Sequence, residues 1–173
     1  MLGARWIAGV ALVASGALGQ VTGTQGTAQA PGDGRQRFES PMVLETPFTR
    51  IDRLPKRGSV VLSDLSEFWC EDARLLAVSV QKTQENSKTT RFRISGFVFV
   101  RPSFDRTAHL SVDLVAGEQA VARGADRKID AEEEKSTPFK VDLDVPAGSL
   151  ARLREAGEDE ARIVFRLVLE DNS

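Results

Sequence analysis

The sequence contains one cysteine, one histidine and no tyrosine among its 173 residues. A single cysteine excludes an internal disulfide framework, and one Cys with one His cannot supply the ligands of a structural zinc site. The 23 Lys and Arg residues are balanced by 25 Asp and Glu residues, so the basic excess that is typical of nucleic-acid binders is also missing. Because 41% of the residues are hydrophobic, the composition is that of a folded domain. We predict no cofactor, no metal and no nucleic-acid partner.

The first 30 residues have the pattern of a secretory signal peptide. Arg5 is the one charged residue in this stretch, and an apolar run follows from Trp6 to Leu18. Ala28 and Ala30 occupy the two small-residue positions of a cleavage site after Ala30, and earlier pairs of small residues between 15 and 19 satisfy the same rule. The alternative is an uncleaved anchor, but 13 helical residues span only about 20 Å of a hydrocarbon core of about 30 Å. We therefore predict a secreted or periplasmic protein without a transmembrane span after cleavage.

The remaining 173 − 30 = 143 residues are enough for one domain with a core of its own. Residues 31–58 are interrupted by several prolines, and only Met42 to Leu44 resembles a short strand there, so we expect a linker or a sheet-edge segment. Residues 59–173 alternate between polar and apolar side chains in many short stretches. We assign them to a single β-sandwich domain.

This alternation predicts about seven short strands in an all-β, antiparallel sandwich. Val112 and Leu114 represent the apolar face of one strand, Val141 and Leu143 that of a second, and Phe165 that of the last. A short helix before the last strand is predicted with Leu150 and Leu153 on one face and Gly157 at its end. An immunoglobulin-like arrangement is the commonest sandwich of this size, although the Cys…Trp…Cys signature and the tyrosine corner are absent.

One stretch departs from the alternation. Leu76, Val78 and Val80 alternate with polar or small residues, but every residue from Phe97 to Val100 is apolar. This run predicts either a central strand covered on both faces or a bulge at Gly96 that changes the face.

The sequence offers two candidate nucleophiles. His109, Ser111 and Asp113 fall on one face of a strand, about 6.5 to 7 Å apart in succession, with the serine in the middle. A Ser-His-Asp triad instead needs the histidine between the other two residues, so an ordinary polar strand face is the better interpretation. Cys70 follows Phe68 and Trp69, which favours a buried thiol. We predict no catalytic residues, and the alternative is a small hydrolase or thiol enzyme that uses His109 with Ser111 or Cys70.

Acidic residues form two further groups. The loop over residues 126–134 contains five acids, but it lacks the spacing of a calcium loop and includes Arg127 and Lys128, so a solvated loop of mixed charge is expected and calcium remains an alternative. Asp142 and Asp144 face outward, where a salt bridge to a base such as Arg162 or Arg166 is expected.

Arginine dominates the bases, at 17 of the 23. Its planar fork pairs with carboxylates and its stem covers apolar surface, as protein interfaces require. We therefore predict a non-enzymatic module that binds a protein or a cell-envelope component, and the alternative is a structural subunit of an envelope assembly. The predicted partner-binding residues cluster around the strand that contains Gly96, and they are Arg91, Arg93, Arg101 and Arg106.

Overall fold

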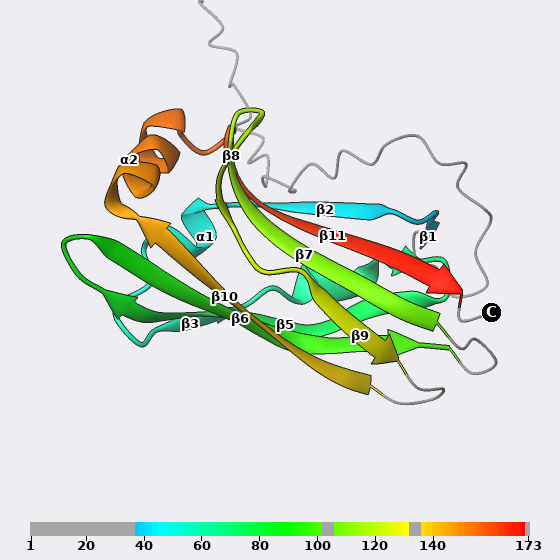
Figure 1. Cartoon of the computed structure of the whole chain (residues 1–173). Coiled ribbons are helices and arrows are strands. Elements are labelled where there is room, and N and C mark those ends of the chain that lie inside the picture. The colour runs from blue at the N-terminus through cyan, green and yellow to red at the C-terminus, as the bar shows by residue number, and fades with distance from the viewer. Residues whose placement is uncertain (1–36, 102–105, 132–135, 172–173) are drawn as a thin grey trace, which may run out of the picture.

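The structure, a computed structural model, describes residues 37–101, 106–131 and 136–171. The predicted signal peptide over residues 1–30 and Glu132 to Glu134 of the acidic loop lie outside the described residues. Figure 1 shows two layers of strands, with two short helices at one end.

Each layer is one sheet. Sheet A contains, in spatial order, β1 (Arg37–Phe38), β4 (Trp69–Cys70), β5 (Ala73–Glu85), β6 (Thr89–Val100) and β10 (Ser136–Pro146), with β3 (Ser59–Val61) also paired to β5. Sheet B contains β2 (Met42–Pro47), β11 (Ala161–Asp171), β7 (Arg106–Ala116) and β8 (Gln119–Arg123), with β9 (Arg127–Ala131) also paired to β7. The helices are α1 (Thr49–Asp52), the 3-10 helix η1 (Ser63–Glu67) and α2 (Ala147–Ala156).

The fold is an all-β sandwich of two antiparallel sheets, and α2 is the short helix before the last strand, which confirms the predicted fold class. Among the described strands, the pair β1 and β4 is parallel and the other pairs are antiparallel. The described strands are longer than we expected, since β5, β6, β7, β10 and β11 have 11 to 13 residues each. Strands of this length give each sheet a large outer face.

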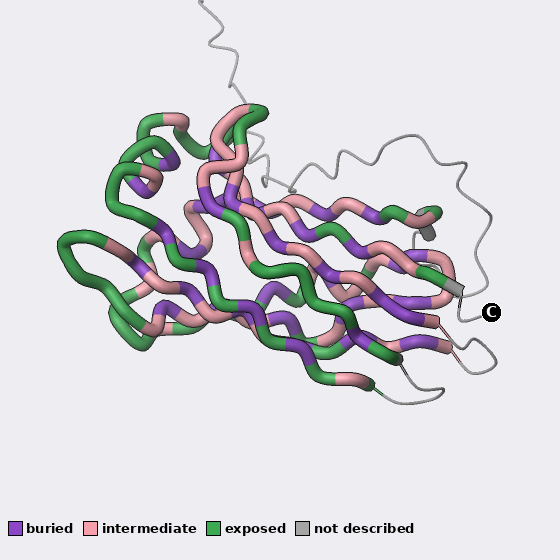
Figure 2. The backbone as a smooth tube through the Cα atoms, in the orientation of Figure 1, coloured by how far each residue is buried: buried purple, intermediate pink, exposed green. Residues whose placement is uncertain are grey.

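The core lies between the sheets and is made by every second residue of the long strands. Figure 2 shows this alternation along the backbone of β10, where buried and exposed residues follow one another. Fully burying a large apolar side chain stabilises a fold by roughly 1.5–3 kcal/mol, so these rows dominate its stability. The predicted inward residues of β7, β10 and β11 are confirmed, and those with at most 1% exposure include Leu110, Val112, Leu114, Val141, Leu143, Val145, Ile163 and Phe165.

The apolar run after Gly96 does not have either of the structures we predicted. In β6, Val98 and Val100 are buried, whereas Phe97 is 41% exposed, so the strand is covered on one face only and keeps its alternation through Gly96. The bulge lies in β5 instead, where the register with β6 shifts between Leu76 and Ser79 and Ala77 has a positive φ of 49°. Sequence alternation missed this because a bulge in one strand leaves no trace in its partner.

The bulge also corrects the prediction for β5. Leu75 and Val78 are buried, and Leu76, predicted to share the face of Val78, pairs with Phe97 on the outer face. Gly96 is opposite the bulge, and a Cβ there would lie 2.9 Å from the Leu76 carbonyl oxygen and 3.0 Å from the Phe139 ring. A residue without a side chain is therefore required at this position for the bulged strand to approach.

Part of the segment assigned to a linker or sheet edge contributes to the core. β2 pairs antiparallel with β11 at the edge of sheet B, and Met42 and Leu44 are at most 1% exposed. Pro41 immediately precedes β2, and Pro47 is its last residue. Because β2 is an edge strand, neither proline removes a hydrogen bond from the interior of the sheet.

The two α-helices, α1 and α2, lie at the same end of the sandwich (Figure 1). α2 places the buried Leu150 and Leu153 against the strands and ends at Gly157, whose φ is 80°. The Arg154 Nε atom is 3.0 Å from the Asp52 carboxylate, which joins α2 to the end of α1. The opposite end, called the open end below, is where β6 ends and β7 begins.

We expect Gly96→Ala to destabilise the fold by about 1–3 kcal/mol, because the added methyl group would overlap the Leu76 carbonyl and the Phe139 ring. Gly148→Ala is the matched control, since a Cβ at this position in α2 meets nothing within 4 Å and alanine favours a helix by up to about 1 kcal/mol. Urea denaturation of both variants measures the difference. Equal stabilities would contradict the proposed close approach of β5 and β6.

Candidate interaction surface

The structure separates the four predicted arginines into two groups. Arg91 and Arg93 lie on the outer face of sheet A, toward the helical end. Arg101 and Arg106 flank the open end, roughly 25 Å further along if β6 rises 3.3 Å per residue. The arginines therefore do not form one cluster, and their role in partner binding stays a prediction.

The first group is engaged in ion pairs with β10. The Arg91 Nε atom is 2.6 Å from Asp144 Oδ1, and the Arg93 Nε atom is 2.9 Å from Asp142 Oδ1. Hydrogen bonds from these guanidinium groups hold the pKa of both carboxyl groups below the usual range of aspartate. Each pair compensates its own charge, so this half of the face has little attraction left for an acidic partner.

The predicted partners of these aspartates were wrong. Asp142 and Asp144 do not bridge to Arg162 or Arg166, because both of those arginines belong to β11 in the other sheet. Arg162 instead donates from Nη1 to Glu45 of β2, at 2.7 Å.

In the second group, Arg101 packs on Trp69 at the open end, together with Arg74. The Arg101 guanidinium carbon lies 4.4 Å from the centre of the Trp69 ring, and that of Arg74 lies 4.7 Å from it. Phe99 packs edge-on against Trp69, with a separation of 6.0 Å between ring centres. Arg106 is apart from this stack and forms an ion pair with Glu71. The indole is therefore covered by two cations, each in the geometry of a cation–π contact.

This stack continues into an apolar surface. Phe97 lies two residues before Phe99 on the same face, and its register partners are Leu76 in β5 and Pro138 in β10. Two large hydrophobic side chains are exposed in the described part of the chain, Phe97 at 41% and Val61 at 58%, and both are on the outer face of sheet A. We call the set Trp69, Arg74, Leu76, Phe97, Phe99 and Arg101 the aromatic patch.

Sequence reasoning identified one member of the aromatic patch, Arg101, and missed the others. The signal was present in the run from Phe97 to Val100, in which a half-covered strand would place two phenylalanines on its outer face. Trp69 and Arg74 could not be added, because they come from β4 and β5 and meet Arg101 only through the pairing of three strands.

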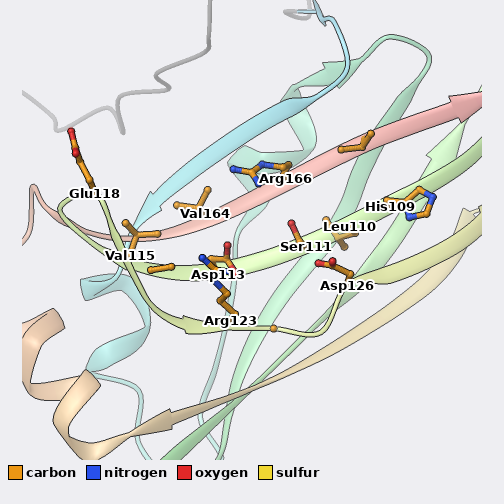
Figure 3. A pocket seen from close by; sticks show the side chains of 13 residues that line it. His109, Leu110, Ser111, Asp113, Val115, Glu118, Arg123, Asp126, Val164 and Arg166 are labelled. Atoms are coloured by element: carbon orange, nitrogen blue, oxygen red, sulfur yellow. The ribbon is translucent and has the colours of Figure 1, made fainter.

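The outer face of sheet B has a basin of about 580 Å³. Figure 3 shows His109, Ser111 and Asp113 in a row along β7, with Arg123 beside Asp113 and Arg166 on the neighbouring β11. Partial burial raises the pKa of the Asp113 carboxyl, and the guanidinium groups of Arg123 and Arg166 oppose that rise. The basin thus contains both acidic and basic side chains.

The row along β7 has no triad geometry. The His109 Nε2 atom lies 3.2 Å from a Glu170 carboxylate oxygen, on β11, so the imidazole is oriented by a different acid from the one predicted to share its face. Ser111 lies between the other two residues along the strand, as the sequence indicated. The histidine is therefore paired with Glu170 and does not stand between a serine and an aspartate as a triad requires.

The Cys70 thiol is inaccessible. Cys70 has 0% exposure in β4, and its Sγ atom is 3.7 Å from the Leu167 carbonyl oxygen of β11. Burial raises the pKa of this thiol to about 11. A thiol that stays protonated and covered is a poor nucleophile.

The predicted acidic loop is corrected in its described part, because Arg127–Ala131 form strand β9 and pair with β7. Its side chains show the expected mixture of charges. Asp130 accepts a hydrogen bond from the Thr107 hydroxyl at 3.2 Å and lies 3.7 Å from Lys128. Within residues 37–101, 106–131 and 136–171, no three His, Cys, Asp or Glu side chains are grouped to hold a metal ion. None of the helices described there is long and apolar enough to cross a membrane.

No family model, curated protein or solved structure matches this chain. The evidence for the candidate interaction surface is therefore its geometry in this structure.

We expect native Cys70 to resist iodoacetamide for hours at pH 8, because burial covers the sulfur atom and the raised pKa keeps the thiol protonated. In 6 M guanidinium, which unfolds the chain, we expect alkylation within minutes. Intact mass spectrometry counts the added groups. Rapid labelling of the native chain would instead revive the thiol-enzyme interpretation.

We expect Asp113→Asn to gain stability relative to the parent chain as the pH rises from 3 to 7. The folded-state pKa of Asp113 is raised, so the folded chain holds this proton more tightly and loses stability as the group ionises. Asp142→Asn is the control of opposite sign, since the pKa of Asp142 is lowered and its ionised form favours the fold. Chemical denaturation at four pH values measures both slopes, and slopes of equal sign would contradict the assigned shifts.

Proposed function

We propose that this chain is an exported binding module without enzymatic activity, and that it attaches to a protein partner through the aromatic patch. The observation that carries the proposal is the exposure of Phe97 on the outer face of β6, next to the stack of Trp69 with two arginines. An aromatic side chain that is left in water at the centre of a sheet face contributes little to the fold. Covered by a partner, it would remove apolar surface from water.

The chemistry of the aromatic patch indicates the kind of partner. Aromatic residues and arginine are the residue types that most often carry the binding energy of protein interfaces. Arg74 and Arg101 pack over the Trp69 ring, so their guanidinium groups are held in place before a partner arrives and lose less entropy on binding. We infer a protein surface with an apolar side chain that covers Phe97 and carboxylates that meet the two guanidinium groups.

The surroundings of Cys70 and His109 also support a binding role, although less directly. Cys70 is buried with a raised pKa, and His109, the candidate base for Ser111, has its ring paired with Glu170, so neither candidate nucleophile has the surroundings of an activated one. Export rests on the pattern of residues 1–30 in the sequence.

We expect Phe97→Ser to weaken capture of the partner at least tenfold, because a central aromatic anchor is lost from the interface. The chain is expressed from its complete coding sequence, immobilised, and exposed to the secreted and envelope fractions of its own host, with cross-linking and mass spectrometry of what it retains. Val164→Ser is the matched control, since Val164 lies half-buried on the outer face of sheet B.

A protein retained by the parent chain and the control but lost from Phe97→Ser supports the proposal. Retention that is equal in all three overturns it, as does capture of a polysaccharide or of this chain alone. The mass of the purified protein tests export in the same preparation. An N-terminus at Pro31 in an exported fraction is expected, and an intact Met1 in the cytoplasm contradicts it.

A further inference from the structure

A second surface lies along the flank where the two sheets come together, and it adjoins the aromatic patch at Pro138, the register partner of Phe97. β10 is the edge strand of sheet A, and β9 is an edge strand of sheet B that runs beside it. A groove of about 350 Å³ lies between these two strands. We call it the lateral groove.

Apolar side chains form part of the lateral groove. Ile129 of β9 is 5% exposed and Phe139 of β10 is 6% exposed, so each presents a small part of its surface. Pro138, which is exposed, extends this surface along β10. An apolar side chain of a bound segment would meet a preformed surface here.

The charges around the lateral groove are mostly positive. Arg127 and Lys128 come from β9 and Lys140 from β10, and all three are exposed. The acid that lines the groove, Asp142, is already paired with Arg93 at 2.9 Å. Asp130 lies 3.7 Å from Lys128 and offsets part of its charge, so Arg127 and Lys140 provide most of the remaining attraction for an anion.

The backbone of β10 presents free hydrogen-bonding groups to the same groove. In an antiparallel ladder, alternate residues bond to the neighbouring strand and the residues between them point away. The Ala147 N–H donates to the Lys88 carbonyl at 2.9 Å and continues the register of β10 with β6, which assigns the odd-numbered residues to that ladder. Lys140 and Asp142 therefore direct their backbone N–H and C=O groups to the free edge, where the described structure has no partner strand.

Pro138 agrees with this assignment. Proline has no N–H, so it fits a strand only where its nitrogen faces a free edge. Its even number places its nitrogen on the same side as those of Lys140 and Asp142.

We propose that the lateral groove binds an extended acidic segment of a protein, which adds a strand to the free edge of β10. Its backbone would pair with Lys140 and Asp142, its carboxylates would lie beside Arg127, Lys128 and Lys140, and its alternate apolar side chains would lie on Ile129 and Phe139. Strand addition of this kind takes affinity from main-chain hydrogen bonds and specificity from side chains at every second position. The inference does not depend on the proposed function, because it uses a different surface.

The probe is a fluorescent ten-residue peptide that alternates Glu and Val, followed by anisotropy at 50 mM salt. We expect saturable binding that weakens at least tenfold at 500 mM salt, and no binding of the matched Lys and Val peptide. Equal binding of the two peptides overturns the proposal.

Two substitutions at one position separate the backbone from the charge. Lys140→Ala removes the ammonium group but keeps the N–H, and we expect a loss of a few fold. Lys140→Pro removes both, and we expect a further loss of at least fivefold. Pro138, two residues away, shows that this edge of β10 accommodates proline. Equal affinities of the two variants contradict strand addition, and melting temperatures confirm that both are folded.

N-methylated peptides test the same point without altering the protein. A strand presents the N–H groups of alternate residues to opposite edges, so methylation of every Val nitrogen blocks one edge and methylation of every Glu nitrogen blocks the other. We expect one of these peptides to bind and the other to fail. If both bind alike, the peptide does not add to the sheet. Arg74→Ser changes the aromatic patch on β5, which β6 separates from the groove strand β10, and it should leave peptide binding within twofold. This variant distinguishes failure at the lateral groove from failure at the aromatic patch.

Discussion

The rows of inward-facing apolar side chains on β5, β6, β7, β10 and β11 hold the two sheets together. The one cysteine forms no disulfide, so the burial of these rows supplies most of the stabilisation. This constraint fixes the identity of every second residue in the long strands and leaves the others to solvent, ion pairs or partners. Outward positions can therefore be judged by a simple test. A charged pair such as Arg93 with Asp142 needs no further explanation, whereas an exposed Phe97 does.

The bulge in β5 determines which side chains reach that outer face. It adds a residue opposite Gly96 and restores the inward position of Val78, while Leu76 is placed beside Phe97. Without the bulge, the alternation of β5 would direct Leu76 inward together with Val78. Gly96 lacks the Cβ that would meet the Leu76 carbonyl, whereas Ala77 adopts a positive φ of 49° at the bulge despite its Cβ. The aromatic patch depends on both.

The rows of β7, β10 and β11 could be predicted from the sequence because a strict period of two has only one interpretation in a half-buried strand. Features that depend on a neighbouring strand could not be predicted in this way. The run from Phe97 to Val100 is compatible with several arrangements, and the bulge that decides between them is in β5. The arginine cluster was inferred from proximity along the chain, yet an extended strand separates Arg93 from Arg101 and gives each different neighbours. The stack on Trp69 requires the pairing of three strands, which no local pattern contains.

The edge strands of the two sheets are arranged differently on the two flanks of the sandwich. On one flank, β4 contacts β11, and the Cys70 thiol approaches the Leu167 carbonyl, so the gap between the sheets is filled. On the other, β9 and β10 leave a groove lined by bases. Charged side chains and prolines on an edge strand prevent identical chains from pairing edge to edge, because like charges would be brought together. Arg127 and Lys140 repel a second copy of the same edge, but they attract a carboxylate. The residues that protect β10 from self-association are therefore also the ones that select an acidic strand.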